Sequence, residues 1–252
     1  MKNIFVSSTF LDFQEERDIL RKEVMPQLNA IAAGYGESVS FSDLRWGINT
    51  SEIKEEDVSS VILSSCLDEI DRSRPYMLIL LGERYGFTPG EELIKSEVDR
   101  RNLYLDDLEI SITQLEIEYG LFDRNEGAKH VFIYFREDSA LVTDFSKDES
   151  AYRKLQKLKS RIMYDFGECV HFYSKDNIST GEFTQIVIQD ILQDLETEWN
   201  ESIQLSEYER EYNVHHLAMI EKAKYFSACE EFATEVMKNI QYQPYSNYAL
   251  VG

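Results

Sequence analysis

Two glutamates in the stretch ISITQLEIEYGL (residues 110–121) have the type and spacing that could support catalysis. The apolar face of a helix is indicated by residues three and four apart: Ile112, Leu115, Tyr119 and Phe122. Glu116 flanks that face, and Glu118 lies on the far side. A carboxyl at such a margin either sits in a cleft with a raised pKa or extends its tip into water. Periodicity alone favours a solvent-exposed carboxylate for both glutamates, and we expect Glu118 at the surface.

Three hydroxyl residues, Ser7, Ser8 and Thr9, follow the apolar run NIFV and precede a helical pattern. Hydroxyls and free backbone N–H groups at the start of a helix suit an anion such as phosphate. Alternatively, Ser8 or Thr9 only caps the helix, and both roles are compatible. Neither GxGxxG nor a complete P-loop occurs within these residues.

Two more segments place polar and aromatic side chains after apolar runs. In SDLRWGIN (42–49), Asp43 could bond a ribose, Arg45 a phosphate, and Trp46 could stack on a base. The alternative is an Asp–Arg ion pair over a buried tryptophan.

In GERYGFTP (82–89), Gly82 permits close backbone approach, and Arg84 and Tyr85 could contact a ligand. A plain loop is the alternative for this segment.

Apolar runs alternating with amphipathic patterns predict an α/β fold with five parallel strands and helices on both faces. The runs RPYMLILLG and KHVFIYFRE are almost wholly apolar, as expected for strands buried on both faces. Ligands of such sheets bind at the carboxyl ends of the strands, near the reversal of strand order, which selects the segments above. Strands are expected at 3–8, 38–44, 74–82, 129–137 and 169–174, and helices at 10–33, 51–73, 110–122, 148–166 and 181–199. The polar segment 83–109 resembles an inserted loop with a short helix near 91–101.

The pattern changes after Trp199, so we place a domain boundary near residue 200, with one domain at 1–200 and an extension at 201–252. The pattern of the extension predicts two helices, 206–223 and 227–241, followed by YQPYSNYALVG.

The composition narrows the classes of partner and binding site that the chain can have. A net charge of −21 repels nucleic-acid phosphates and anionic lipid, so we expect neither as a partner. The three cysteines and four histidines form no metal-ligand spacing, which predicts no metal and no disulfide framework. Without a signal peptide or an apolar run long enough for a bilayer, a cytoplasmic protein is expected.

Four motifs occur in one order: FVSSTFLDFQEERDIL, DLRWGI, CLDEIDRSRPYMLILLGERYGFTP and SITQLEIEYG. Over about residues 1–200 they resemble the domain of unknown function at the N-terminus of many STAND-type (NACHT-like) ATPases, including telomerase-associated, nephrocystin-like and bacterial antiviral relatives. That family is similar to TIR domains and nucleoside deoxyribosyltransferases, which implies a flavodoxin-like fold.

The resemblance also implies a site. TIR enzymes cleave the nicotinamide–ribose bond of NAD with a helical glutamate that follows a small residue by three positions and precedes a second acid by two. Thr113, Glu116 and Glu118 reproduce this spacing, and the deoxyribosyltransferase pattern also falls on Thr113 and Glu116. Both analogies select Glu116 over Glu118 as the catalytic residue, and the TIR resemblance implies NAD as a substrate, with no cofactor. The chain departs from the TIR pattern in having Thr113 for the usual cysteine and Ile112 for the tryptophan often found before it.

The C-terminal residues YSNYALVG look like the first strand of an ATPase domain, where an apolar strand ending in glycine enters the Walker A loop. The chain stops at Gly252 before any GKS or GKT. We therefore expect 201–252 to be a helical linker and first strand leading into an absent ATPase domain. The expected partners are the ATPase and sensor domains and further copies of the chain.

Two functions follow. One is an effector that hydrolyses NAD or a related nucleotide when clustered, in immune or antiviral signalling. The alternative is a non-catalytic assembly module acting through homotypic contacts. A housekeeping deoxyribosyltransferase fits the multidomain tail less well, and a nuclease is disfavoured because no acid–lysine constellation stands out and the net charge is so negative.

Overall fold

The computed structural model describes residues 1–9, 11–43, 55–124, 129–137 and 149–200, with 208, 209, 211, 212, 215, 216 and 219 beyond them. Its centre is a five-stranded sheet in the order β2-β1-β3-β4-β5, in which every neighbouring pair is parallel. This order confirms the expected flavodoxin-like α/β fold. The strands are β1 Lys2–Ser8, β2 Val39–Ser42, β3 Met77–Leu81, β4 Val131–Arg136 and β5 Val170–Tyr173.

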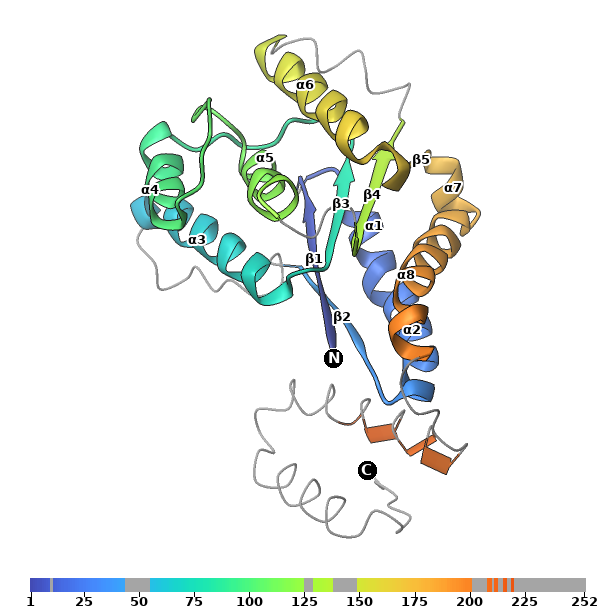
Figure 1. The fold of residues 1–252 in the computed structure, drawn as a ribbon. Helices are drawn as coiled ribbons and strands as arrows, with labels where there is room; N and C mark the ends of the chain where they lie inside the picture. The colour runs from blue at the N-terminus through green and yellow to red at the C-terminus, as the bar shows by residue number, and fades with distance from the viewer. Residues whose placement is uncertain are drawn as a thin grey trace.

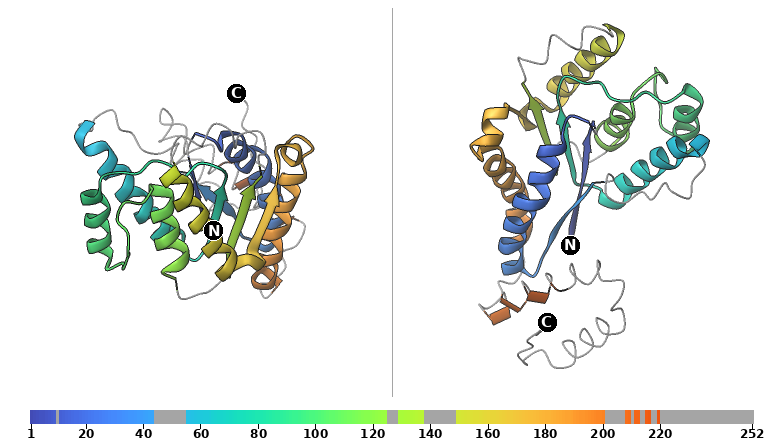
Figure 2. Two further views of the ribbon diagram at one scale, coloured as in Figure 1. Left: turned by 90° about the horizontal axis from the view of Figure 1, so that it is seen from above. Right: turned by 180° about the vertical axis from the view of Figure 1, so that it is seen from behind.

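Helices cover both faces of this sheet (Figures 1 and 2). One layer contains α1 (Gln14–Ile19), a π-helical turn (Leu20–Val24), α2 (Met25–Ala32) and α8 (Glu182–Asn200). The other contains α3 (Glu55–Ser73), α4 (Glu91–Arg101), α5 (Ile112–Ile117) with a π-helical continuation (Glu118–Phe122), and α6 (Glu149–Phe166). The short helix α7 (Lys175–Ser179) precedes α8 and was not expected from the sequence.

Strand alternation divides the core between these two layers. Leu78 and Leu80 of β3 pack with the α1, α2 and α8 layer. Met77, Ile79 and Leu81 pack with the layer of α3, α5 and α6. Every side chain of β3 is buried, so its continuous apolar sequence is explained by a position in the middle of a parallel sheet.

The strand order reverses at β1, which pairs with β2 on one side and β3 on the other. The connections that follow β1 and β3 run to opposite sides of this point. The carboxyl ends of the two strands therefore border a crevice of the kind in which such sheets bind ligands.

The expected extension at 201–252 lies almost wholly outside the described residues, so its helices, its strand and the boundary near residue 200 stay predictions. Among the helices that the structure describes, none combines the length and hydropathy needed to cross a membrane.

Gly120 offers a test of the packing between α5's continuation and the sheet. An added Cβ would lie 2.7 Å from Met77 Sδ and 3.3 Å from Ile70 Cγ2. Gly120→Ala should therefore lower the free energy of unfolding by about 1–3 kcal/mol, although alanine normally favours helix over glycine. Urea denaturation measures this change. Gly167→Ala is the control, because its added Cβ would meet only the Met163 methyl, at 3.7 Å; equal effects of the two variants would contradict the packing.

Candidate functional site

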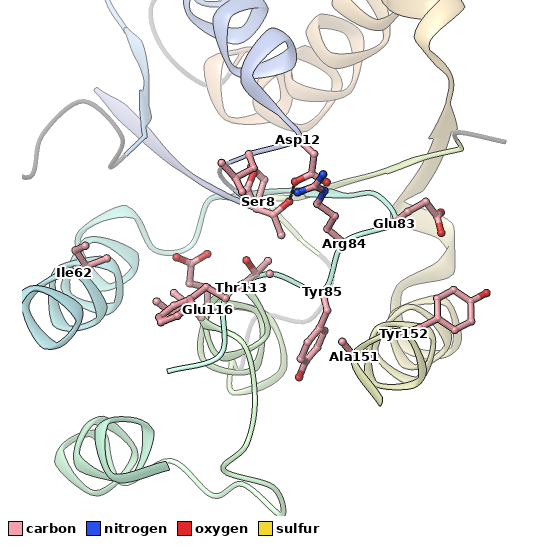
Figure 3. Close-up of a pocket in the computed structure, with 15 residues that line it drawn as sticks. Ser8, Asp12, Ile62, Glu83, Arg84, Tyr85, Thr113, Glu116, Ala151 and Tyr152 are labelled. Carbon is pink, nitrogen blue, oxygen red and sulfur yellow. Dashed lines mark hydrogen bonds between the residues drawn. The ribbon is translucent and has the colours of Figure 1, made fainter. Parts of the chain in front are cut away.

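A cavity of about 590 Å³ opens at the carboxyl edge of the sheet, beside the reversal of strand order (Figure 3). Its size is that of a small-molecule or cofactor pocket. Five segments line it: the end of β1 with the following turn, α3, the loop after β3, α5 and the start of α6. The lining residues are Ser8, Thr9, Leu11, Asp12, Ile62, Glu83, Arg84, Tyr85, Gly86, Phe87, Ile112, Thr113, Glu116, Ala151 and Tyr152.

Glu116 is the buried carboxyl of this cavity, with 5% of its surface exposed. Ser7 Oγ donates a hydrogen bond of 2.6 Å to Glu116 Oε2, and the Cys66 thiol donates toward the same carboxylate. Burial raises the pKa of Glu116 to about 7, although these two donors and the charge of Arg17 act in the opposite direction. Near neutral pH the group therefore exchanges between its acid and carboxylate forms, which suits acid–base or nucleophilic chemistry.

Local hydrogen bonds hold α5 in place. Ser111 caps the helix by accepting a bond of 3.1 Å from the backbone N–H of Gln114. The N–H of Ile112 donates to the carbonyl of Phe87 at 3.0 Å, which fastens the first turn of α5 to the loop after β3. Glu116 therefore has a fixed position relative to that loop.

Gly86 allows the same loop to pass between β1 and α5. Its φ of +95° is a conformation that favours glycine. An added Cβ would lie 3.1 Å from Thr9 Cγ2 and 3.3 Å from Thr113 Oγ1. The two threonines predicted as site residues are thus brought together across this glycine.

The expectation that Glu118 lies at the surface is wrong. Only 8% of the residue is exposed, and its two carboxylate oxygens accept bonds of 2.9 and 2.8 Å from Arg161. Gln114 Nε2 donates to it at 3.3 Å. The reason is that α6 packs along the side of α5 that faces away from Glu116, so that side is an interface.

Asp43 forms an ion pair with Arg17, a buried residue of α1. Arg17 also donates to Ser8 through Nε to Oγ at 2.8 Å and through Nη2 to the carbonyl at 3.1 Å. The alternative predicted from the sequence, a pair of Asp43 with Arg45 over Trp46, stays a prediction. Arg45 and Trp46 lie outside the described residues.

The loop after β3 contributes unequally to the cavity. Gly82 packs against Phe13, where an added Cβ would lie 3.1 Å from the ring, and it is not a lining residue. Arg84 lines the cavity and points toward Asp12 in Figure 3. Tyr85 donates its hydroxyl proton to Gln114 Oε1, and burial raises the pKa of Tyr85 to about 12.

Asp12 is a lining carboxyl that sequence reasoning missed. It accepts a hydrogen bond from Thr9 Oγ1, and burial raises its pKa against the opposing effects of Thr9, Arg136 and Arg84.

Arg17, Cys66 and Tyr152 were also missed. Arg17 stands four residues after Phe13, on the buried face of α1, and an arginine at such a position signals a buried partner. Cys66 reads as an apolar residue of α3, and no local signal distinguishes Tyr152. In the described part of the chain, no group of three or more His, Cys, Asp or Glu side chains could hold a metal ion.

The fold and cavity define a doubly wound α/β domain with a buried carboxyl at its topological switch point. The chain belongs to the family described as Domain of unknown function (DUF4062), whose model matches residues 3–187. It is 30% identical to telomerase protein component 1 of Rattus norvegicus over 75% of this chain and 8% of that protein.

Two further relatives are a tetratricopeptide repeat protein 41 of Rattus norvegicus, 31% identical over 67% of this chain and 16% of the relative, and a TPR repeat-containing protein of Dictyostelium discoideum, 25% identical over 92% and 15%. The chain thus spans less than a fifth of the length of these relatives. No solved structure matches it.

The raised pKa of Glu116 predicts a pH-dependent stability. Because the pKa is about 7 in the folded protein and ordinarily 4.5, the stabilising effect of the neutral carboxyl is complete below pH 4.5 and is lost as the pH rises to about 7. Glu116→Gln has no such loss, so its stability relative to the native chain should increase by about 3 kcal/mol across that window.

Urea unfolding from about pH 4.5 to about pH 8 measures this difference. Glu109→Gln, at an exposed side chain, controls for the loss of one negative charge. A difference between Glu116→Gln and the native chain that is constant with pH would show that burial does not raise this pKa.

Proposed function

We propose that this domain is the effector of a larger STAND-type ATPase and cleaves the N-glycosidic bond of NAD or a related nucleotide when clustered. One observation carries the proposal: the Glu116 carboxyl is buried in the wall of a nucleotide-sized cavity at the switch point of a flavodoxin-like sheet. The TIR-like spacing of Thr113, Glu116 and Glu118 points to the same group.

In the proposed reaction, the bond between ribose C1′ and the nicotinamide nitrogen breaks, and its electron pair leaves with nicotinamide. The ribose then carries an oxocarbenium-like positive charge. The ionised Glu116 stabilises that charge or attacks C1′ to form an ester. Water supplies the new oxygen, either directly or by displacing the ester, and one proton is released. The products are nicotinamide and ADP-ribose.

The other lining residues suit the remaining parts of a nucleotide. Arg84 is placed to pair with a phosphate. Around the mouth, Leu11, Phe87 and Tyr152 expose apolar surface from three different segments. An aromatic base can stack on such side chains. The segment with Arg45 and Trp46 directly follows Asp43 in the chain and is a candidate for further contacts.

The relatives support a multidomain setting. Each is several times longer than the matched region, and the printed names of two of them include tetratricopeptide repeats. We infer that the domain acts beside other modules of one chain, and that its partners are those ATPase and sensor modules and further copies of itself. A role in immune or antiviral signalling belongs to this proposal and rests on the resemblance to STAND proteins.

A non-catalytic assembly module is the second candidate, supported by exposed aromatic side chains away from the cavity. Tyr104 is 85% exposed, Tyr164 on α6 is 90% exposed, and Phe172 on β5 is half exposed. Such residues suit contacts between proteins. Calorimetry with NAD and ADP-ribose separates the two functions, because a pure scaffold binds neither.

Glu116→Gln should lower NAD cleavage by an artificially clustered form of the chain at least about 100-fold, because the amide cannot offset the charge on C1′. Nicotinamide release measures the rate. Glu118→Gln is the matched control, since this neighbouring glutamate is also buried but bonds Arg161 outside the cavity. Equal turnover by Glu116→Gln and the native chain would remove Glu116 from the mechanism.

Tyr152→Ala should weaken nucleotide binding about tenfold, the typical effect of losing one base–aromatic stack. Calorimetry with NAD measures the dissociation constant. Tyr164→Ala provides the control, because this residue lies on the same helix but is not a lining residue of the cavity. If the two variants bind NAD equally well, the mouth of the cavity does not hold a base.

A further inference from the structure

Ser7 and Ser8 are neighbours in β1 that serve opposite faces of the sheet. Ser8 bonds Arg17 of α1, whereas Ser7 bonds Glu116 of α5. Ser7 is fully buried and is not among the residues that line the cavity. Its hydroxyl is therefore poorly placed for a substrate phosphate, the role predicted from the sequence, and well placed to act on the carboxylate.

Cys66 approaches the same carboxylate from α3. The residue is 1% exposed, and its thiol donates toward Glu116. Burial, and next the charge of Glu116, raise the pKa of this thiol well above its ordinary value, so the sulfur keeps its proton. A buried thiol of this kind is a donor and not a nucleophile.

We propose that Ser7 and Cys66 are positioning residues: two buried donors, from β1 and α3, that orient the Glu116 carboxylate toward the cavity. Ser7 holds Oε2 at 2.6 Å, so the carboxylate cannot turn without breaking this bond. Because the donors come from two different elements, they fix both the direction and the depth of the side chain. This assignment rests on the proposed function for its catalytic meaning, but the restraint itself exists in the free protein.

The two donors also stabilise the charged form of Glu116 against burial. Removing one of them should therefore raise the pKa of Glu116 by about one unit. The effect should follow the donor proton and not the volume of the side chain. Cys66→Ser, which keeps a donor, should titrate close to the native chain, whereas Cys66→Ala should not.

The test is a carbon-13 NMR titration of the Glu116 side-chain carboxyl in the native chain and in Ser7→Ala, Cys66→Ala and Cys66→Ser. Ser73→Ala is the control, because Ser73 is equally buried but accepts its hydrogen bond from Asn3. We expect midpoints about one unit higher in the two alanine variants than in the control and in Cys66→Ser. If Ser7→Ala does not fold, the comparison of Cys66→Ala with Cys66→Ser tests the donor effect by itself.

Unchanged midpoints in the alanine variants would overturn the positioning role, whether or not the chain cleaves NAD. Raised midpoints without NAD cleavage by the artificially clustered native chain would leave the positioning role established and refute the proposed function. Where NAD is cleaved, the acid limb of the kcat/KM profile should move with the NMR midpoint, because both report ionisation of Glu116 in the free protein.

Discussion

A carboxyl group that must be kept away from water and still be able to ionise is the constraint on which this site depends. Burial disfavours the charge of Glu116, so the surrounding elements have to supply donors and positive charge. Ser7 comes from β1, Cys66 from α3 and Arg17 from α1. A parallel sheet whose order reverses at β1 brings these segments to one edge, so the strand order determines which groups act on the Glu116 charge.

Two ion pairs stabilise the same edge of the sheet from the other face. Arg17 pairs with Asp43, and Arg136 pairs with Glu16 at 2.6 Å while also donating to the carbonyl of Asp12 at 2.6 Å. Each pair gives a buried arginine of the α1 layer an oppositely charged partner, as a buried charge requires. The internal pairing commits Arg17 and Arg136 to the scaffold, and among the described residues that line the cavity the cation is Arg84.

The fold was predictable because β3 and β4 are buried on both faces and the helices carry clear stripes; the short helix expected near 91–101 is α4. The site was predictable only in part. The helical period places Glu116 beside an apolar stripe, but its burial depends on Ser7 and Cys66, which are distant in sequence. The same limit produced the error at Glu118, since the helix that covers it begins some thirty residues later. Helical periodicity indicates the direction in which a side chain points, and tertiary packing decides whether solvent or another element lies on that side.

A pKa near 7 at Glu116 has a consequence for the proposed reaction. A neutral carboxyl cannot stabilise a developing positive charge, so at neutral pH the free domain is only partly in the ionised form that the proposed reaction requires. The nicotinamide ring of NAD is cationic, and a cation bound beside a carboxyl favours its ionised form. By linkage, the proposed substrate would favour loss of the proton from the carboxyl that its cleavage requires, whereas a neutral nucleoside would not. In the proposed reaction, the role of the buried donors is to keep the ionised group directed at C1′ when the ring leaves.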